Sequence, residues 1–561
     1  MDRRTFLKYA LASSVVVWVG DQIPKHLGLD QADIKGLFSV EPANAAYSAF
    51  PQSVASGDPQ PNGITLWTRI ACTASSARVA IEISSNPSFS GQTLRGVTVD
   101  TNPQRDYTVK AKITSPELKP FQTYYYRFIF NGTASRTGRF KTLPAPNANV
   151  DRVRFAYVSC SDYTNGYFNA YTYLAQEDVD FVVHLGDYIY ETVNDPSFQN
   201  AQVRRIQLPS GNSQAETLED YRFLYKTYKS DANLQRVHEN FAFINVWDDH
   251  EFANDCYQIY DTDSADEQQN RAPNRRQAAS QAWVEYTPAS ISFDANQEPL
   301  TALRIYRSFA FGNLLELVMT DERLYRDGPP CGLEMRQRYV TPGCANRNNP
   351  NRTMLGNTQR DWFLNKIRNS SRIWKIWGNE VMTMQLKVLS TFATVFFRQF
   401  TPDLFIVLDQ WDGYPAERAQ IFSSVRQAGV KNFVTITGDL HTFVAGYQKV
   451  NFDSPTEPPV GVCFVVGSIS AANFSEQSVF SASGSPTPPI NQVTQILRAS
   501  NRHLKYFNSA THGYNLVEVT PQSLTCTMKA VDTVTEPQAN LRTLKAYVVP
   551  RDQIQIQEVA G

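Results

Sequence analysis

Chemically reactive side chains follow five apolar segments of this sequence. The segments end in "SCSD", "GDYIYE", "DDHE", "GNE" and "GDLH". A turn after a strand needs a glycine or a capping residue, but it does not need a thiol, a phenol, an amide, two imidazoles and several carboxylates. The reactive residues are, in chain order, Cys160, Asp187, Tyr190, Asp248, Asp249, His250, Glu251, Asn379, Asp439 and His441.

The apolar segments are predicted to be strands of one α/β domain. They alternate with helical patterns, such as the one that Thr217 caps and the one that begins at Pro415 and ends before Gly429. Strands that are apolar throughout indicate a sheet covered on both faces. Because ligands bind at the carboxyl ends of such strands, we expect the reactive residues to meet in one crevice. So many carboxylates in one place need a cation, and a pair of divalent or trivalent metal ions is the simplest source.

The residue pattern outside these segments divides the chain into further parts. Residues 46–147 consist of short β-rich runs and predict an all-β sandwich of the fibronectin or immunoglobulin type, with a tyrosine-corner segment at 118–128. A Pro/Asn-rich linker precedes the α/β domain, which we assign to residues 148–520. Residues 521–561 return to strand-like alternation and predict a β-rich extension at the C-terminus.

The first 45 residues have the pattern of a twin-arginine export signal. Arg3 and Arg4 precede a short apolar run, and "ANA" at 43–45 is a suitable cleavage site. An uncleaved anchor is the alternative, since signal and anchor share the apolar run. The sequence thus predicts the export machinery as a partner and the periplasm or the extracellular space as the location.

Composition and cysteine content narrow the function. The formal net charge of −1 indicates no nucleic-acid-binding surface. The seven cysteines are an odd number, so at least one is unpaired in an exported protein. Cys331 and Cys344 bracket a short loop and could form a disulfide.

The motifs together resemble those of the calcineurin-like metallophosphoesterases, and the fuller set resembles the PhoD family of alkaline phosphatases. The matching segments, which span roughly residues 50–445, are "SVASGDP", "WTR", "GYFNAY", "HLGDYIYE", "VWDDHE", "DERLYR", "LGNTQRDWF", "WDGY" and "TGDLHTF". The resemblance implies an N-terminal β-sandwich, a four-layer α/β/β/α catalytic domain and hydrolysis of phosphomonoesters and phosphodiesters outside the cytoplasm.

The resemblance also implies a Fe³⁺ and a Ca²⁺ site. Cys160, Asp187, Tyr190 and His441 would hold the ferric ion, and Asp187 would bridge to a calcium ion also bound by Asp249, Asn379 and Asp439. Thiolate, phenolate and imidazole donors suit iron, whereas carboxylate and amide oxygens suit calcium. Asn379 departs from the family pattern, which more often has Gln at this position. The expected reaction is in-line attack on phosphorus by a metal-bound hydroxide or oxide.

Several residues have two interpretations at this stage. His250 would stabilise the transition state or protonate the leaving oxygen, or it is a structural histidine bonded to Glu251. Arg323 would clamp phosphate oxygens, or it forms a salt bridge with Asp321. Asp248, Glu251, Asp412 and Tyr414 are expected to support the ligands or to line the mouth of the site.

Two alternative functions remain open from the sequence. One is a phospholipase D-like phosphodiesterase that acts on lipids or teichoic-type polymers, with peripheral contact to membrane lipid or cell-wall polymer. The other is an exported, non-catalytic binding module with a decayed metal site, which the complete ligand set argues against.

Overall fold

The structure is a computed structural model that describes residues 15–16, 46–90, 93–195, 199, 201–397, 402–477 and 489–559. The predicted export signal, with Arg3, Arg4 and the cleavage site, lies outside the described residues apart from β1 (Val15–Val16), which pairs with β6 (Thr108–Thr114).

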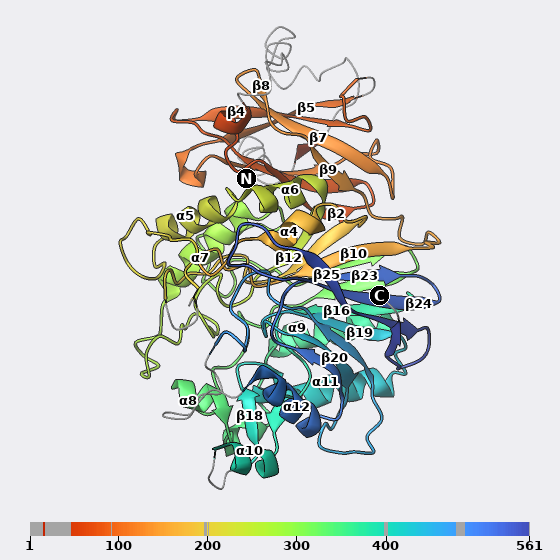
Figure 1. Cartoon of the computed structure of the whole chain (residues 1–561). Coiled ribbons are helices and arrows are strands. Elements are labelled where there is room, and N and C mark those ends of the chain that lie inside the picture. Colours follow the sequence, from red (N-terminus) through yellow and green to blue (C-terminus); the bar gives the residue numbers. More distant parts are fainter. Residues whose placement is uncertain are drawn as a thin grey trace.

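Two large mixed sheets form the body of the molecule (Figure 1). The first has the order β1-β6-β3-β2-β12-β11-β10-β23-β24-β25-β26, and the second the order β13-β14-β16-β19-β21-β20-β22. The further strands of the first sheet are β2 (Val54–Gln60), β3 (Gly63–Arg69), β10 (Val153–Val158), β11 (Phe181–Leu185), β12 (Ala242–Val246), β23 (His512–Val519), β24 (Ser523–Val531), β25 (Leu541–Pro550) and β26 (Gln557–Val559). Those of the second are β13 (Arg307–Phe311), β14 (Leu315–Met319), β16 (Trp374–Asn379), β19 (Phe433–Thr437), β20 (Phe443–Gln448), β21 (Gly461–Val465) and β22 (Leu504–Asn508).

The strands that end in reactive residues are parallel neighbours within each sheet. In the first sheet β10, β11 and β12 pair in parallel, and in the second β14, β16, β19 and β21 do so. A smaller sheet, β15 (Tyr339–Thr341), β18 (Leu404–Val407) and β17 (Lys387–Val388), lies beside them. This arrangement places the carboxyl ends of the parallel strands at a common edge, as the sequence predicts.

Helices cover the outer faces of the two sheets, which gives the predicted four-layer order (Figure 1). They are α4 (Asn169–Leu174), α5 (Leu218–Tyr228), α6 (Ala232–Asn240) and α7 (Pro273–Tyr286) in the first half, and α9 (Gly356–Asn369), α11 (Pro415–Gln427) and α12 (Ile490–Ser500) in the second. Thr217 caps α5 through the backbone N–H of Asp220, and Pro415 opens α11, so both sequence-based starts are confirmed.

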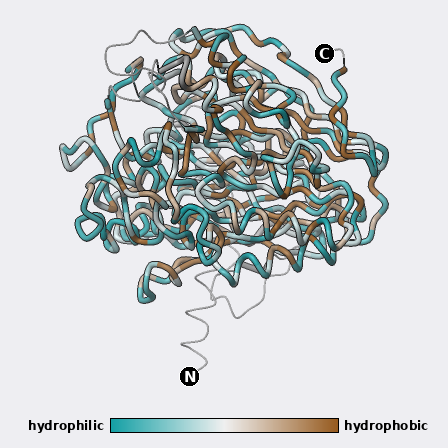
Figure 2. The backbone as a smooth tube through the Cα atoms, turned by 90° about the horizontal axis from the view of Figure 1, so that it is seen from below, coloured by the Kyte–Doolittle hydropathy of each residue, from teal (hydrophilic) through white to brown (hydrophobic). Residues whose placement is uncertain are grey.

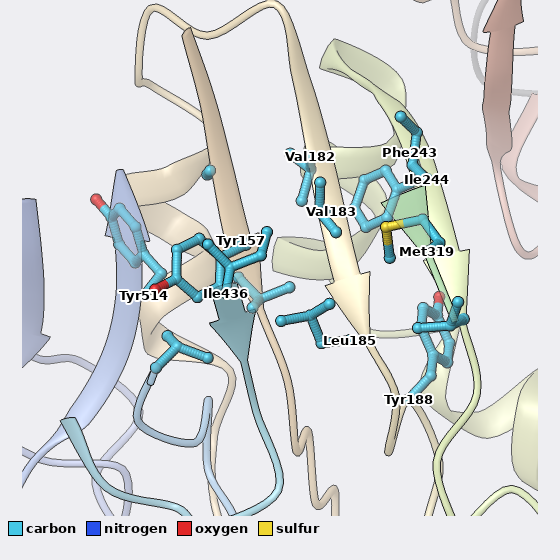
Figure 3. Packing of buried hydrophobic residues seen from close by; sticks show 14 of the residues in the cluster. Tyr157, Val182, Val183, Leu185, Tyr188, Phe243, Ile244, Met319, Ile436 and Tyr514 are labelled. Carbon is cyan, nitrogen blue, oxygen red and sulfur yellow. The ribbon is translucent and has the colours of Figure 1, made fainter. Parts of the chain in front are cut away.

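The core lies between the two sheets. Leu185 from β11 and Ile436 from β19 lie close together there, and Met319 from β14 packs near Phe243 from β12 (Figure 3). All four side chains are buried. Hydrophobic segments run through the middle of the molecule, whereas many outer helices and loops are hydrophilic (Figure 2). The apolar strands are therefore the ones covered on both faces.

The N-terminal residues form a β-sandwich whose two sheets enclose a separate core. One sheet holds β5 (Thr93–Thr101), β4 (Ala77–Ser84), β7 (Thr123–Phe130), β8 (Thr133–Ala134) and β9 (Gly138–Lys141). The other, β6-β3-β2, continues into the catalytic sheet because β2 pairs in parallel with β12. In the predicted tyrosine corner, the Tyr124 hydroxyl donates to the Glu117 carbonyl at 3.2 Å and accepts from the Lys119 amide at 2.8 Å.

The C-terminal strands β24, β25 and β26 extend the first sheet through antiparallel pairing with β23 and with one another. Cys331 and Cys344 form the expected disulfide, and Cys72, Cys160, Cys256, Cys463 and Cys526 are free. Within the described part of the chain, every helix is too short or too polar to cross a bilayer.

Candidate metal centre

Two glycines allow the strand ends to approach one another. A Cβ on Gly186, whose φ is +94°, would lie 2.4 Å from the Asp248 Cβ, so β11 and β12 could not end as close together with another residue there. A Cβ on Gly438 would lie 2.6 Å from the Ser159 side chain, which precedes Cys160. The glycine of each "GD" motif is therefore required by close packing of the strand ends.

Four of the predicted ligands have a strained backbone. Cys160, Asp187, Asp439 and His441 have φ values of 60°, 54°, 60° and 53°. Residues other than glycine rarely adopt positive φ, and such strain is concentrated at functional sites. These turns point the four side chains back across the sheet edge.

The structure brings the predicted iron ligands together. Ligand atoms of Cys160, Asp187 and His441 lie within 4.8 Å of one another. The Tyr190 hydroxyl donates to the Asp187 Oδ2 at 3.3 Å and lies 3.2 Å from the His441 Nε2. Burial, reinforced by the charge of Asp187, raises the pKa of both the Cys160 thiol and the Tyr190 phenol well above their ordinary values. Both groups would ionise at neutral pH only beside a cation, so the donor set fits a metal ion.

His441 is oriented by the opposite side of its ring. Its Nδ1 lies 2.7 Å from the Ala472 carbonyl, which leaves Nε2 facing Asp187 and Tyr190. The loop that carries Ala472 is held by His512, whose Nδ1 lies 2.9 Å from the Ser468 hydroxyl and whose Nε2 lies 3.0 Å from a Glu476 carboxylate oxygen. Sequence reasoning found no partner for His512, because these contacts join residues of separate segments.

Carboxylates form a second, overlapping group. Ligand atoms of Asp248, Asp249 and Asp439 lie within 4.8 Å of one another, as do those of Asp249, Asp255 and Asp409. The Asp248 Oδ2 is buried without a hydrogen-bond partner among the described residues. An orphaned carboxylate oxygen beside further carboxylates is suited to a hard cation such as Ca²⁺.

Arg323 lies inside this acidic group. Its guanidinium contacts Asp248, Asp409 at 2.5 Å, Asp439 at 2.8 Å and Asp249 at 3.5 Å, and its side chain is fully buried. The expected salt bridge with Asp321 is wrong, because the Asp321 Oδ1 accepts from the backbone N–H groups of Arg323 and Leu324 instead. Burial tends to raise the pKa of Asp249, but the charges of Arg323 and His250 outweigh it and lower that pKa.

His250 pairs with a residue that sequence reasoning did not assign. Its Nδ1 lies 2.7 Å from Glu191 Oε2, and its ring lies over Tyr190 with 4.1 Å between ring centres. Burial lowers the pKa of His250, yet the nearby carboxylates of Glu191, Asp187 and Asp249 raise it well above its ordinary value overall. Glu191 is the last residue of "GDYIYE", so its place in that motif was the available signal.

Glu251 binds the backbone of the ligand-bearing loops and does not bind His250. Its carboxylate accepts from the backbone N–H groups of Asp187 at 3.0 Å, Tyr188 at 2.7 Å and Asp248 at 2.8 Å. The alternative of a His250–Glu251 hydrogen bond is therefore wrong. Glu251 instead ties together the two loops that carry the ligands, in line with the expectation that it supports them.

Asn379, Asp412 and Tyr414 lie outside the lining of the cavity and have other partners. The Asn379 Oδ1 accepts from the Trp411 indole at 3.2 Å. Asp412 accepts from the Leu386 N–H at 2.8 Å and from Arg418 at 2.9 Å, and the Tyr414 hydroxyl donates to the Asp327 carbonyl. Asp412 and Tyr414 thus stabilise the loop that leads away from the site.

Asp409 and Gln410, just before these residues, lie at the site instead. Gln410 donates to Asp439 and accepts from the Met382 N–H, and both Asp409 and Gln410 line the cavity. The signal for them was present, since "LFIVL" is also an apolar segment that ends in an aspartate.

Part of this group of residues lines a cavity of about 780 Å³, whereas Cys160, Asp248, Glu251 and Arg323 are buried and do not belong to its lining. Its polar floor includes Asp187, Tyr190, Asp249, His250, Asp409, Asp439 and His441. A volume of this size accommodates a small organic ester together with its reacting phosphate.

Comparison with known proteins agrees with this geometry. The "PhoD-like phosphatase" family matches residues 155–528, and "PhoD-like phosphatase, N-terminal domain" matches residues 37–144. Alkaline phosphatase D of Bacillus subtilis is 31% identical over 580 aligned residues, which cover 100% of this chain and 89% of the relative.

Two solved structures are similar to this chain in fold. A structure described as that of PhoD superposes with a TM-score of 0.80 at 30% identity and covers 93% of this chain and 94% of the other. A purple acid phosphatase from yellow lupin shares the fold, with a TM-score of 0.50 at 13% identity and coverage of 89% and 74%. The chain therefore belongs to the PhoD-like phosphatase family and is a metal-dependent phosphoric ester hydrolase.

Proposed function

We propose that this enzyme hydrolyses phosphomonoesters and phosphodiesters with Fe³⁺ and Ca²⁺ in the cavity floor. The observation that supports this most directly is the meeting of Cys160, Asp187, Tyr190 and His441 around one point, with Asp187 also close to Asp249 of the acidic group. Soft and aromatic donors on one side and oxygen donors on the other favour two different metals.

The second ion would be held by Asp187, Asp249 and Asp439, with Asp409 as a further oxygen donor nearby. Asn379 remains a proposed ligand, but its amide oxygen would have to release the Trp411 indole. Bound metal ions would supply positive charge to the phosphate oxygens and lower the pKa of a water molecule.

The protein itself would supply the proton for the leaving group. His250 lies in the cavity lining with its Nδ1 against Glu191, and the nearby carboxylates raise its pKa, so the protonated ring would donate a proton to the leaving oxygen as the P–O bond breaks. Arg323 would act as a fixed cation that keeps the carboxylates close together, in place of the phosphate clamp that the sequence suggested.

Elemental analysis of natively produced protein, with a visible absorption spectrum, tests the metal assignment. We expect iron and calcium, with a tyrosinate-to-iron band that is lost in Tyr190→Phe. Tyr188→Phe is the matched control, because the Tyr188 hydroxyl contacts His238 away from the ligands, and it should retain the band. Zinc or manganese without such a band would overturn the roles of Cys160 and Tyr190. Absence of both metal and hydrolysis would favour the binding-module alternative.

We also propose export by the twin-arginine route to the periplasm or the extracellular space. The Cys331–Cys344 disulfide supports this location, because disulfides persist mainly in oxidising compartments. Replacing both Arg3 and Arg4 with Lys should retain the protein in the cytoplasm. Unchanged export of this variant, measured by fractionation, would contradict the proposal.

A further inference from the structure

The cavity above the proposed metal centre has two chemically different walls. One wall is polar and includes Thr192, Asp195, Ser213, Gln214 and Asp263. The apolar wall consists of Met335, Val340, Val407, Leu440, Ala472 and Phe474, four of which belong to or pack against one core cluster, and the polar residues Arg336 and Tyr339 line the cavity next to Met335 and Val340 in the chain. A substrate whose phosphate reaches the floor would therefore place any apolar substituent against the second wall.

The disulfide-closed segment Cys331–Cys344 carries the outer part of the apolar wall. Its short helix α8 (Met335–Arg338) begins with a capping box between Glu334 and Gln337. Met335 is 62% exposed and is the most exposed large hydrophobic side chain among the described residues. A flexible, polarisable thioether at the rim of a cavity is well suited to contact aryl or alkyl groups of various shapes.

The base of this segment is firmly held. Arg338 and Tyr339 both bind the carboxylate of Asp255, with the Tyr339 hydroxyl at 2.7 and 2.8 Å from its two oxygens. On the other side Tyr339 pairs with Val407 in β18, and the Leu408 N–H donates to the Arg338 carbonyl at 2.7 Å. Because β18 leads into Asp409, the segment is attached to the acidic group on both sides.

Further features show that the wall is built to keep its shape. Val340 has a φ of 44°, which is a strained conformation for a β-branched residue and needs support from its surroundings. That support is a core cluster that includes Leu440 and Phe474 and against which Val340 and Val407 pack. Rigid support of this kind allows the wall to discriminate between substrates.

From these observations we propose that the Cys331–Cys344 segment is the substrate-selecting wall of the cavity. It binds the apolar substituent of a phosphodiester, with Met335 as the residue that makes the outermost contact. This proposal rests on the proposed phosphodiesterase function and specifies the substrates that the same site prefers: diesters whose non-leaving oxygen carries a large apolar group, such as an aryl group, over diesters that carry a methyl group there.

Two synthetic diesters test the wall without changing the chemistry. Phenyl p-nitrophenyl phosphate and methyl p-nitrophenyl phosphate release the same p-nitrophenolate and differ only in the second substituent. We expect the wild-type enzyme to prefer the phenyl ester, and Met335→Ser to lower the phenyl-to-methyl ratio of kcat/KM by about 3- to 10-fold, because an open wall contacts only one face of the ring. Ile554→Ser is the matched control, since Ile554 is 41% exposed and lies away from the cavity lining, and it should leave the ratio unchanged.

The variant Cys331→Ser/Cys344→Ser examines the wall as a unit. Without the disulfide the two ends of the segment are no longer joined. The phenyl-to-methyl ratio of kcat/KM should therefore fall in this variant too, whatever the change in the absolute rates for the two esters. A wild-type ratio near one, or an unchanged ratio in Met335→Ser, would overturn the proposal. If the wild-type enzyme hydrolyses neither ester, the phosphodiesterase function itself is refuted. This result is distinct from a changed or unchanged ratio, which tests only the wall.

Discussion

Removal of the His250 side chain should affect esters of poor leaving groups far more than esters of good ones. An alkoxide needs a proton as it leaves, whereas p-nitrophenolate leaves readily without one. General acid catalysis contributes about 10²- to 10⁴-fold, so His250→Ala should lose that factor on an alkyl phosphate. On a p-nitrophenyl ester the loss should be roughly 10-fold or less, because little of this catalysis is needed.

The Glu191 contact sets the size of a second effect. A buried hydrogen bond between charged groups contributes about 1.5–3 kcal/mol, and the 2.7 Å contact of Glu191 with His250 is of this kind. Glu191→Gln should therefore lower the pKa of His250 and slow alkyl ester hydrolysis by about 10- to 100-fold. A general acid works only while protonated, so activity is lost as pH rises through its pKa. The alkaline limb of the pH profile should thus move to lower pH in Glu191→Gln.

Steady-state kcat/KM for an alkyl and a p-nitrophenyl ester, measured as a function of pH, checks both effects. His503→Gln is a suitable control, because His503 contacts the Gln385 carbonyl outside the cavity, and it should leave both rates unchanged. Equal losses on the two esters in His250→Ala would refute the reasoning and make His250 a binding or structural residue.

Three further predictions concern the elements that support the site. Gly438→Ala should cost about 1–3 kcal/mol of stability and reduce iron content, because its Cβ would push β19 away from Ser159. Gly429→Ala is the control, since a Cβ there meets nothing within 4 Å, and this variant should keep its metals. A full iron content of Gly438→Ala in elemental analysis would contradict the prediction. His512→Ala should shift the tyrosinate-to-iron band, since the loop that orients His441 loses its support, and an unchanged spectrum would show that the loop holds without it. Lys229→Met should raise the free energy of unfolding by about 1–3 kcal/mol near neutral pH, because burial lowers the pKa of Lys229 to about 7 while nearby aromatic rings only partly compensate. The cost of burying the charged Lys229 is complete below pH 7 and disappears as pH rises toward 10.5, the pKa of lysine in the unfolded chain. In urea unfolding, the extra stability of Lys229→Met over the wild-type protein should therefore shrink between pH 7 and 10.5. An extra stability that stays constant over this range would contradict the burial argument.

Periodicity in the sequence predicted an α/β sheet covered on both faces and brought most of the site together, whereas the four-layer order was implied by the resemblance to a known family. A strand that is apolar throughout must be covered on both faces, and its carboxyl end must lie at the ligand-binding edge. Cys160, Asp187, Asp249 and His441 follow such strands directly, so their meeting could be inferred. Asp409 also follows an apolar segment, but this segment is β18, an antiparallel strand of the small sheet, so the rule does not extend to it.

What could not be predicted depends on side-chain direction and on contacts between distant segments. Glu251 is the glutamate next to His250 in sequence, yet the partner of His250 is Glu191, 59 residues away, because Glu251 binds backbone N–H groups instead. Arg323 contacts carboxylates from three other segments, which no local pattern reveals. The sandwich likewise continues into the catalytic sheet through pairing of β2 with β12, although local texture indicated only a linker between the domains.

The charges of the buried site bear on which metals it would hold. Its overlapping acidic groups contain six aspartates, namely Asp187, Asp248, Asp249, Asp255, Asp409 and Asp439. Three buried arginines contact members of this set: Arg323, Arg326 and Arg338. Six carboxylates less three guanidinium groups leave three negative charges, and His250 is balanced by Glu191.

Ionisation of Cys160 and Tyr190 on metal binding would raise the deficit to five negative charges, which equals the combined charge of one Fe³⁺ and one Ca²⁺. Two divalent ions would leave one charge buried without compensation, a costly arrangement in a low-dielectric interior. Burial raises the pKa values of Asp187 and Asp439, so without cations part of this charge would be removed by bound protons. Metal binding should therefore release protons.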